Sequence, residues 1–146
     1  MFLRSFIVLI GVFSIIQVIS GNEPIRLRNA NELIGEHTEI VDKRTLVGNV
    51  ILQQKNVIVT ANRAIQYLNS NKFHLTGNVI ITQDSLVLKS ESILYDGNIY
   101  LAISDVPLEI TDGNTKLIGD SGTYSTETMV ATFIDNIKLE DDSVII

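Results

Sequence analysis

The chain alternates between apolar and polar residues over most of its length, most regularly in residues 72–81, KFHLTGNVII. Every second residue from Phe73 to Ile81 is apolar or glycine, whereas the residues between them are polar as far as Asn78. A period of two is typical of a β-strand with one buried face. The residues around Val57 and Leu86 alternate in the same way. Outside the first twenty residues there is no sustained helical period, so we expect almost no helix.

These alternating segments recur along the chain. Residues 46–67, LVGNVILQQKNVIVTANRAIQY, are followed by a second copy at 75–95, LTGNVIITQDSLVLKSESILY. Gly48 matches Gly77, and Tyr67 and Tyr95 close the two copies, although the interval between the tyrosines is one residue shorter. A degenerate third copy runs to Tyr124 and a fourth opens at position 135. Self-similarity with a period of roughly 30 residues indicates stacked supersecondary units that share one core.

The pattern predicts an all-β, repeat-built fold of about nine antiparallel strands in two facing sheets. Before each tyrosine the alternation changes phase, at 62–64 and 90–92, which predicts a bulge or corner where a strand passes between sheets. Gln54-Lys55 and 83–85 are expected in turns. Residues 35–44 are expected to form a loop or a weak edge strand. In the third copy the alternation is ambiguous, because either the set with Ile99 and Ile103 or the set with Tyr100, Ala102 and Leu108 could face inward.

Residues 1–21 are expected to be a secretory signal peptide, leaving residues 22–146 as one domain. Arg4 supplies the positive start, Phe6–Ile19 is mostly apolar, and Ser20 and Gly21 suit cleavage. An uncleaved anchor is the alternative, although the apolar run is at or below the length that spans a bilayer.

The charge balance and rare side chains exclude several functions. Without Arg4, 10 basic residues remain against 17 acidic ones, so the charge changes from −6 to −7 and a basic nucleic-acid surface is not expected. The chain has no cysteine, which suits a bacterial periplasm better than a disulfide-linked extracellular role. With two histidines, a metal site or a catalytic triad is not expected, although 119–122, GDSG, resembles a serine-protease motif. No cofactor and no enzymatic activity are predicted.

The alternating Ile, Leu and Val residues leave two interpretations open. They form either an ordinary packed core or an interior that admits acyl chains between the sheets. Periodicity does not choose between these interpretations.

Four short motifs in register carry a resemblance to a known family: ANEL at 30–33, LVGNV at 46–50, VTANRAIQY at 59–67 and LTGNVII at 75–81. With the preceding signal peptide, they resemble the OstA-like family of periplasmic lipopolysaccharide-transport proteins, and most closely its soluble bridge component. The resemblance covers residues 25 to about 139. It implies a V-shaped β-jellyroll that holds the acyl chains of lipopolysaccharide, or of a related glycolipid, inside. It also implies head-to-tail self-association and contact with related jellyroll components at the inner and outer membranes. A membrane-anchored component of the same pathway, or an envelope adaptor that binds no lipid, are the alternatives.

Two sets of residues are the candidate site. The inward positions expected to contact acyl chains are Val50, Leu52, Val57, Val59, Phe73, Leu75, Val79, Ile81, Leu86, Leu88, Phe133, Ile137 and Leu139. The cations expected at a phosphate-binding rim are Lys43, Arg44, Arg63 and Lys72. Residues 143–146 begin an apolar segment that we expect to act as an unpaired edge for self-association.

Overall fold

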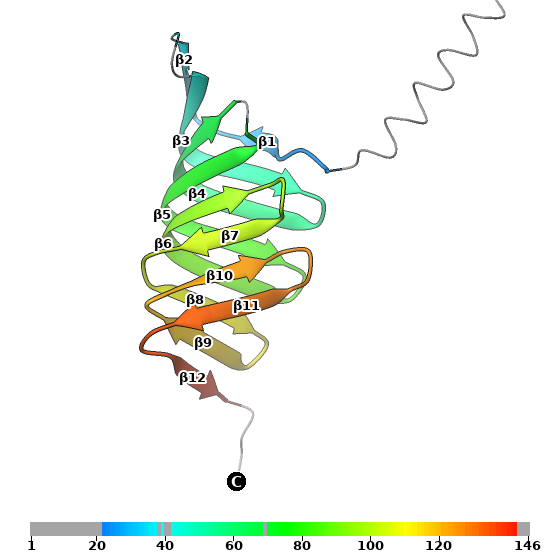
Figure 1. The fold of residues 1–146 in the computed structure, drawn as a ribbon, viewed down its shortest axis with the longest axis vertical. Coiled ribbons are helices and arrows are strands. Elements are labelled where there is room, and N and C mark those ends of the chain that lie inside the picture. Colours follow the sequence, from blue (N-terminus) through cyan, green and yellow to red (C-terminus); the bar gives the residue numbers. More distant parts are fainter. Residues whose placement is uncertain (1–21, 38, 40–41, 69, 143–146) are drawn as a thin grey trace, which may run out of the picture.

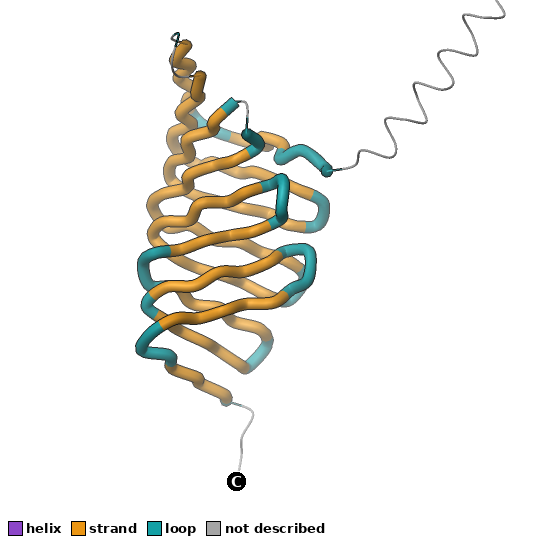
Figure 2. Tube along the Cα trace, viewed as in Figure 1, coloured by secondary structure: helices purple, strands orange, loops and turns teal. Residues whose placement is uncertain are grey.

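The computed structural model describes residues 22–37, 39, 42–68 and 70–142. All regular structure within these residues is β-strand, as expected from the sequence (Figure 2). The described residues contain no helix of the length and apolarity needed to cross a membrane. The predicted signal peptide and the predicted edge at 143–146 lie outside the described residues.

Within the described residues, twelve antiparallel strands form one continuous hydrogen-bonded sheet that is folded on itself (Figure 1). The strands are β1 (Arg26–Asn29), β2 (Glu32–His37), β3 (Asp42–Gln54), β4 (Val57–Tyr67), β5 (Lys72–Gln83), β6 (Leu86–Asp96), β7 (Leu101–Ser104), β8 (Leu108–Asp112), β9 (Thr115–Gly119), β10 (Ser121–Ser125), β11 (Val130–Ile134) and β12 (Lys138–Asp141). The all-β, antiparallel prediction is confirmed. The two facing sheets that were expected are the two halves of one continuous sheet, and the count of about nine strands is too low. The segment at 35–44 mostly belongs to strands β2 and β3.

The strand count is explained by the way the chain crosses the bend. We call each stretch of chain that crosses from one half of the sheet to the other a rung, whether it is one long strand or two short strands separated at the bend. Strands β3 to β6 are four continuous rungs, and β1/β2, β7/β8, β9/β10 and β11/β12 are four rungs interrupted at the bend, which makes eight. One half-sheet contains β1, β8, β9 and β12, and the other contains β2, β7, β10 and β11. In Figure 1 the bends lie on the left and the hairpin turns, which form the mouth of the V, lie on the right.

Glycine–asparagine pairs produce the bends in β3 and β5. Between the pairs Val47↔Arg63 and Val50↔Ala61, positions 48 and 49 lie opposite a single residue of β4. Gly48 has a φ of 74° and Gly77, in the corresponding bend, has a φ of 77°. Such positive values are easy for glycine because it has no Cβ. The corner predicted at 62–64 does lie at the bend of β4. The extra residue of the bulge, however, belongs to the neighbouring strand β3 and not to β4.

The third repeat has one clear inward set. Tyr100, Ala102 and Leu108 are buried, whereas Ile99 is 58% exposed and Ile103 is 37% exposed. The ambiguity in the sequence is therefore resolved in favour of the set with Tyr100, Ala102 and Leu108.

Tyr67 is not the structural equivalent of Tyr95. Gln66 pairs with Phe73, which pairs with Tyr95, so these three side chains share the inner face. Tyr67 is one residue further along its strand, faces outward and is 42% exposed. The sequence already indicated that the two tyrosines are not equivalent, because the interval from Tyr67 to Tyr95 is one residue shorter than the interval from Gly48 to Gly77. A shift of one residue moves a side chain to the other face of a sheet.

Candidate functional site

The inner faces of the two half-sheets form one apolar interior. Ten of the thirteen positions expected to contact acyl chains are buried, with exposed fractions of 7% or less: Val50, Leu52, Val57, Val59, Phe73, Leu75, Val79, Ile81, Leu86 and Leu88. Backbone pairing places Leu52, Val59, Ile81 and Leu88 in one row across four rungs. The middle of the interior is therefore closed by contacts between the half-sheets.

In the described part of the chain, the interior is uncovered at its two ends. At the C-terminal end Leu139 pairs with Leu117 on the inner face and is 63% exposed. Ile137 is 59% exposed, and Phe133 is only partly buried against the core. These three predicted positions are therefore placed at an open end and not in the closed middle.

The N-terminal end is similar. Leu27 pairs with the buried Leu52, and Leu33 pairs with the buried Leu46, so both lie on the inner face. Their exposed fractions are 43% and 52%. An apolar inner face thus extends beyond the closed middle at both ends.

Two tyrosine–glutamine hydrogen bonds cross the mouth, and we call these pairs the seams. The Tyr95 hydroxyl donates to Gln54 Oε1 at 2.7 Å, and the Tyr124 hydroxyl donates to Gln83 Oε1 at 2.7 Å. Both tyrosines are 0% exposed, and Gln54 and Gln83 are 2% and 4% exposed. The sequence had placed these glutamines in turns, but they are the last, inward-facing residues of β3 and β5.

The seam glutamines are held by backbone carbonyls. The side-chain amide of Gln54 donates to the carbonyl oxygens of Glu23 at 2.6 Å and Gly97 at 2.9 Å. The amide of Gln83 donates to the carbonyl oxygen of Thr126 at 2.8 Å. Each glutamine therefore links its own half-sheet to a turn of the opposite one.

Burial favours the neutral, donating form of both seam tyrosines. Loss of solvation raises the pKa of the Tyr95 phenol above its ordinary value, an effect that the hydrogen bond with Thr126 partly offsets. Loss of solvation also raises the pKa of Tyr124, and the nearby carboxylates of Asp84 and Asp112 add to this effect. A neutral phenol is the form that donates to a glutamine oxygen.

The four cations predicted at the rim do not converge. Lys43 pairs with Glu36 at 3.0 Å and Lys72 pairs with Asp96 at 3.1 Å, both on the outer face. Arg63 is exposed on the outer face beside the bend. Arg44 alone lies in the inward row, between Gly35 and Gln66, and is exposed.

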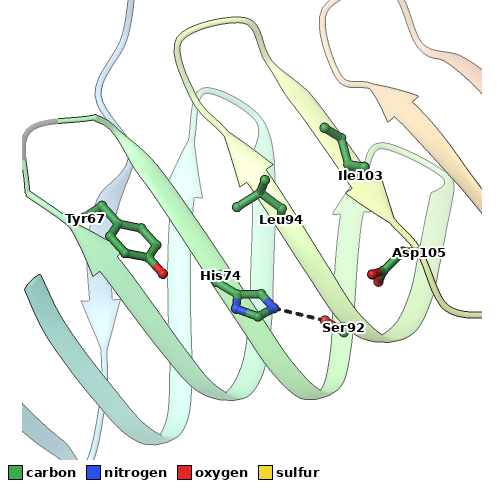
Figure 3. Close-up of a pocket in the computed structure, with 6 residues that line it drawn as sticks. All are labelled: Tyr67, His74, Ser92, Leu94, Ile103 and Asp105. Atoms are coloured by element: carbon green, nitrogen blue, oxygen red, sulfur yellow. Dashed lines mark hydrogen bonds between the residues drawn. The ribbon is translucent and has the colours of Figure 1, made fainter.

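A shallow cavity of about 290 Å³ lies on the outer face of the half-sheet that contains β7 (Figure 3). It is lined by Tyr67, His74, Ser92, Leu94, Ile103 and Asp105. His74 Nε2 lies 3.1 Å from the Ser92 hydroxyl. This cavity is separate from the interior, because its residues point away from the opposite half-sheet.

The protease-like motif has a structural role. Strand β9 ends at Gly119 and β10 begins at Ser121, so the motif spans a bend. Asp120 accepts a hydrogen bond of 2.6 Å from the Asn136 side chain in the neighbouring rung. Within the part of the chain that the structure describes, no cluster of side chains suits a metal ion.

The sequence of this domain matches a known family over most of its length. Residues 22–109 match the model of a family described as OstA-like protein, which is more than half of the chain. The chain belongs to the OstA-like family. No curated protein matches it.

The fold of this OstA-like chain is similar to that of a solved structure, LptH from Pseudomonas aeruginosa. LptH is described as the LptA-homologous periplasmic component of the conserved lipopolysaccharide transport device. The TM-score is 0.68 at 14% sequence identity, and the match covers 80% of this chain and 94% of that chain. At this identity the similarity shows a shared fold, so the expected OstA-like jellyroll is confirmed.

Proposed function

We propose that this OstA-like chain is a periplasmic bridge protein that carries lipopolysaccharide, or a related glycolipid, from the inner to the outer membrane. The main observation behind this proposal is an apolar inner face that runs the length of the jellyroll and remains uncovered at both ends. LptH, which shares the fold, is a periplasmic component of a lipopolysaccharide transport device. No catalytic step and no cofactor are needed for this role.

Acyl chains would enter at the mouth and lie between the half-sheets. The buried residues there are mainly Val, Ile and Leu, whose contacts are non-directional, so hydrocarbon chains can replace them. The hairpin turns at the mouth are short, and the bends on the other side are continuous backbone in β3 to β6. The half-sheets would therefore part at the mouth and pivot at the bends.

The first test of this proposal uses a photocrosslinking residue at Leu75 or at His74. These neighbours face opposite sides of β5: Leu75 is fully buried in the interior, and His74 lines the outer cavity. We expect a lipopolysaccharide adduct from Leu75 and none from His74, measured by mass spectrometry of the exported protein. An adduct at His74 alone would show that the lipid binds the outer cavity.

We also expect Arg44→Ala to weaken the binding of a phosphorylated glycolipid. Charge-assisted hydrogen bonds to phosphate are strong, and Arg44 is the predicted rim cation that lies in the inward row. A loss of roughly 1 kcal/mol, about fivefold in affinity at low salt, is expected from titration calorimetry.

Arg63→Ala is the matched control for Arg44→Ala, because Arg63 is an exposed arginine on the outer face. An equal effect of both variants would mean that arginine acts only through net charge. Affinity that does not change with salt or with Arg44→Ala would remove the rim from the proposal.

Head-to-tail stacking would make the interior continuous between molecules. Among the described residues, the outermost strands of one half-sheet are β1, with the sequence RLRN, and β12, with the sequence KLED. If β12 of one copy pairs with β1 of the next in antiparallel register, Leu139 lies opposite Leu27 and Glu140 lies opposite Arg26. Such a heterologous contact does not close into a dimer, so filaments are expected. The same edges would serve related jellyroll components at the two membranes.

Leu139→Asp should therefore weaken self-association without unfolding the protein, since Leu139 is 63% exposed in the single chain. We expect at least a tenfold increase in the dissociation constant, measured by sedimentation velocity. Thr132→Asp adds the same charge at an exposed, outward-facing position of β11, in the other half of the same rung, and should have little effect. Wild-type protein that remains monomeric at high concentration would contradict self-bridging. Removal of residues 143–146, which the sequence predicts as an unpaired edge, is a second test of self-association.

The alternatives are a membrane-anchored component of the same pathway and an adaptor without lipid. Native mass spectrometry of the exported protein separates them, because it reads cleavage near residue 21, bound lipid and oligomer size together. An intact N-terminus favours the anchored component. A cleaved protein without lipid favours the adaptor.

A further inference from the structure

The two seams place buried polar groups at the mouth of a mainly apolar interior, whereas the buried pair Ser90 and Ser104 lies beside the bend. Each seam joins an inward residue at the end of one half-sheet to a tyrosine of the facing half-sheet. Among the described residues, no buried side-chain nitrogen or oxygen lacks a hydrogen-bond partner. Opening the mouth would therefore break hydrogen bonds that are satisfied in the closed state.

The seams repeat with the architecture. Gln54 and Gln83 are separated by the same interval as Tyr95 and Tyr124, which is one sequence repeat. One repeat corresponds to two rungs, and at about 4.8 Å per rung the seams are roughly 10 Å apart along the jellyroll. The mouth thus carries a regular series of buried hydrogen-bonding groups rather than one isolated pair.

The position of the seams matches a particular part of a glycolipid. Acyl chains in the interior with sugars in solvent would place the ester and amide linkages of the chains at the mouth. These linkages contain carbonyl oxygens, which accept hydrogen bonds. The seam tyrosines supply hydroxyl donors at this level, and the glutamines supply amide groups.

We propose that Tyr95 with Gln54, and Tyr124 with Gln83, are binding subsites for the carbonyl groups that link acyl chains to the lipid headgroup. In the closed state each tyrosine hydroxyl donates to its glutamine. In the loaded state the same hydroxyl donates to an acyl-linkage carbonyl at the mouth. This inference rests on the proposed lipid-carrying function and names the part of the lipid that the seams recognise.

The exchange explains why buried polar groups stand at the mouth. A simple hydrocarbon would break both tyrosine–glutamine bonds and replace neither. The Tyr124 hydroxyl would lose its glutamine acceptor and the Tyr95 hydroxyl would keep only its contact with Thr126, which is unfavourable for buried polar groups. A lipid with carbonyl linkages replaces the broken bond. The seams therefore favour acylated glycolipids over hydrocarbons and keep the jellyroll closed when no such lipid is present.

A measured affinity would not detect this exchange of hydrogen-bond acceptors, because the protein gives up one hydrogen bond as it gains another. The ester carbonyl stretching band of protein-bound lipopolysaccharide reads it directly, since a hydrogen bond to a carbonyl lowers its stretching frequency. We expect a low-frequency ester component in the infrared spectrum of the wild-type complex. This component should be lost in the Tyr95→Phe/Tyr124→Phe double variant, which keeps both aromatic rings but removes both hydroxyl donors.

Tyr67→Phe is the matched control, because Tyr67 lies on the outer face and belongs to neither seam. It should leave the low-frequency component unchanged. If the double variant does not fold, each single variant should remove about half of the component.

The outcomes separate this inference from the proposed function. Lipopolysaccharide that binds wild type and double variant with the same ester band overturns the subsites and leaves the carrier function intact. Wild-type protein that neither binds lipopolysaccharide nor gives an adduct at Leu75 overturns both. Loss of the low-frequency component in the double variant, with its retention in Tyr67→Phe, supports the subsites.

Discussion

Leu75→Asp should abolish the folded state of the isolated protein. Leu75 is 0% exposed and lies in β5, the rung with buried partners on both sides, Ala64 in β4 and Ile93 in β6. The substitution loses about 1.5–3 kcal/mol of leucine burial. It also places an unpaired carboxylate in an apolar interior, which costs several kcal/mol more. The sum is comparable to the whole stability of a domain of this size, about 5–15 kcal/mol.

The measurement is urea unfolding followed by circular dichroism. Thr76→Asp is the control, because Thr76 is the next residue of the same strand, faces outward and is only partly buried. We expect Thr76→Asp to cost less than about 1 kcal/mol. A folded Leu75→Asp protein with near-normal stability would show that the interior already contains water or bound ligand at that level.

The position of the inner face could be predicted from sequence because alternation reports it directly. Ten inward positions were found from the period of two and from the register between repeats. This works where one face is buried along a whole strand, since each correct position then supports the next. Ile137 and Leu139 fit the same pattern but lie at the end of the stack. No neighbouring rung covers them among the described residues, and alternation carries no information about which rung is last.

The seams could not be predicted in the same way. In each seam the tyrosine and the glutamine are 41 residues apart in the sequence, and they meet only because two half-sheets face each other across the mouth. A glutamine before a turn residue is usually a solvated turn residue, so local reasoning assigned Gln54 and Gln83 to turns. The available signal was the equal spacing of the two glutamines and of the two tyrosines that bond to them. The apparent match of Tyr67 to Tyr95 concealed it.

The bends also show the limit of single-strand reasoning. The phase change in β4 was visible in the sequence, but a bulge is a property of two paired strands. The extra residue could lie in either strand, and the positive φ values place it at Gly48-Asn49 and Gly77-Asn78. Four further rungs are each divided into two short strands at the bend. Alternation along one strand does not report such a break, so the predicted strand count was too low.

Alkaline pH should destabilise the protein through the two seam tyrosines. The pKa of Tyr95 and the pKa of Tyr124 are both raised in the folded state, mainly by burial. The folded state thus holds these two protons more tightly than the unfolded chain, in which tyrosine ionises near pH 10. Their contribution to stability is complete below that pH and is lost as pH rises through the raised folded-state pKa values. In this window each tyrosine should lower the free energy of unfolding by up to about 1.4 kcal/mol per pH unit, or up to about 2.7 for both.

Urea titrations between pH 8 and 11.5 measure this slope. The Tyr95→Phe/Tyr124→Phe variant removes both ionising groups and should show a much flatter alkaline limb, although its stability at pH 8 will be lower because Gln54 and Gln83 lose their donors. Tyr67→Phe removes a phenol that is 42% exposed and should keep the wild-type slope. If the free energy of unfolding falls equally steeply with pH in wild type, in the double variant and in Tyr67→Phe, the mouth opens and the seams become hydrated before the chain unfolds. In that case the seam tyrosines would ionise within the folded protein, and alkaline pH would open the jellyroll without denaturing it.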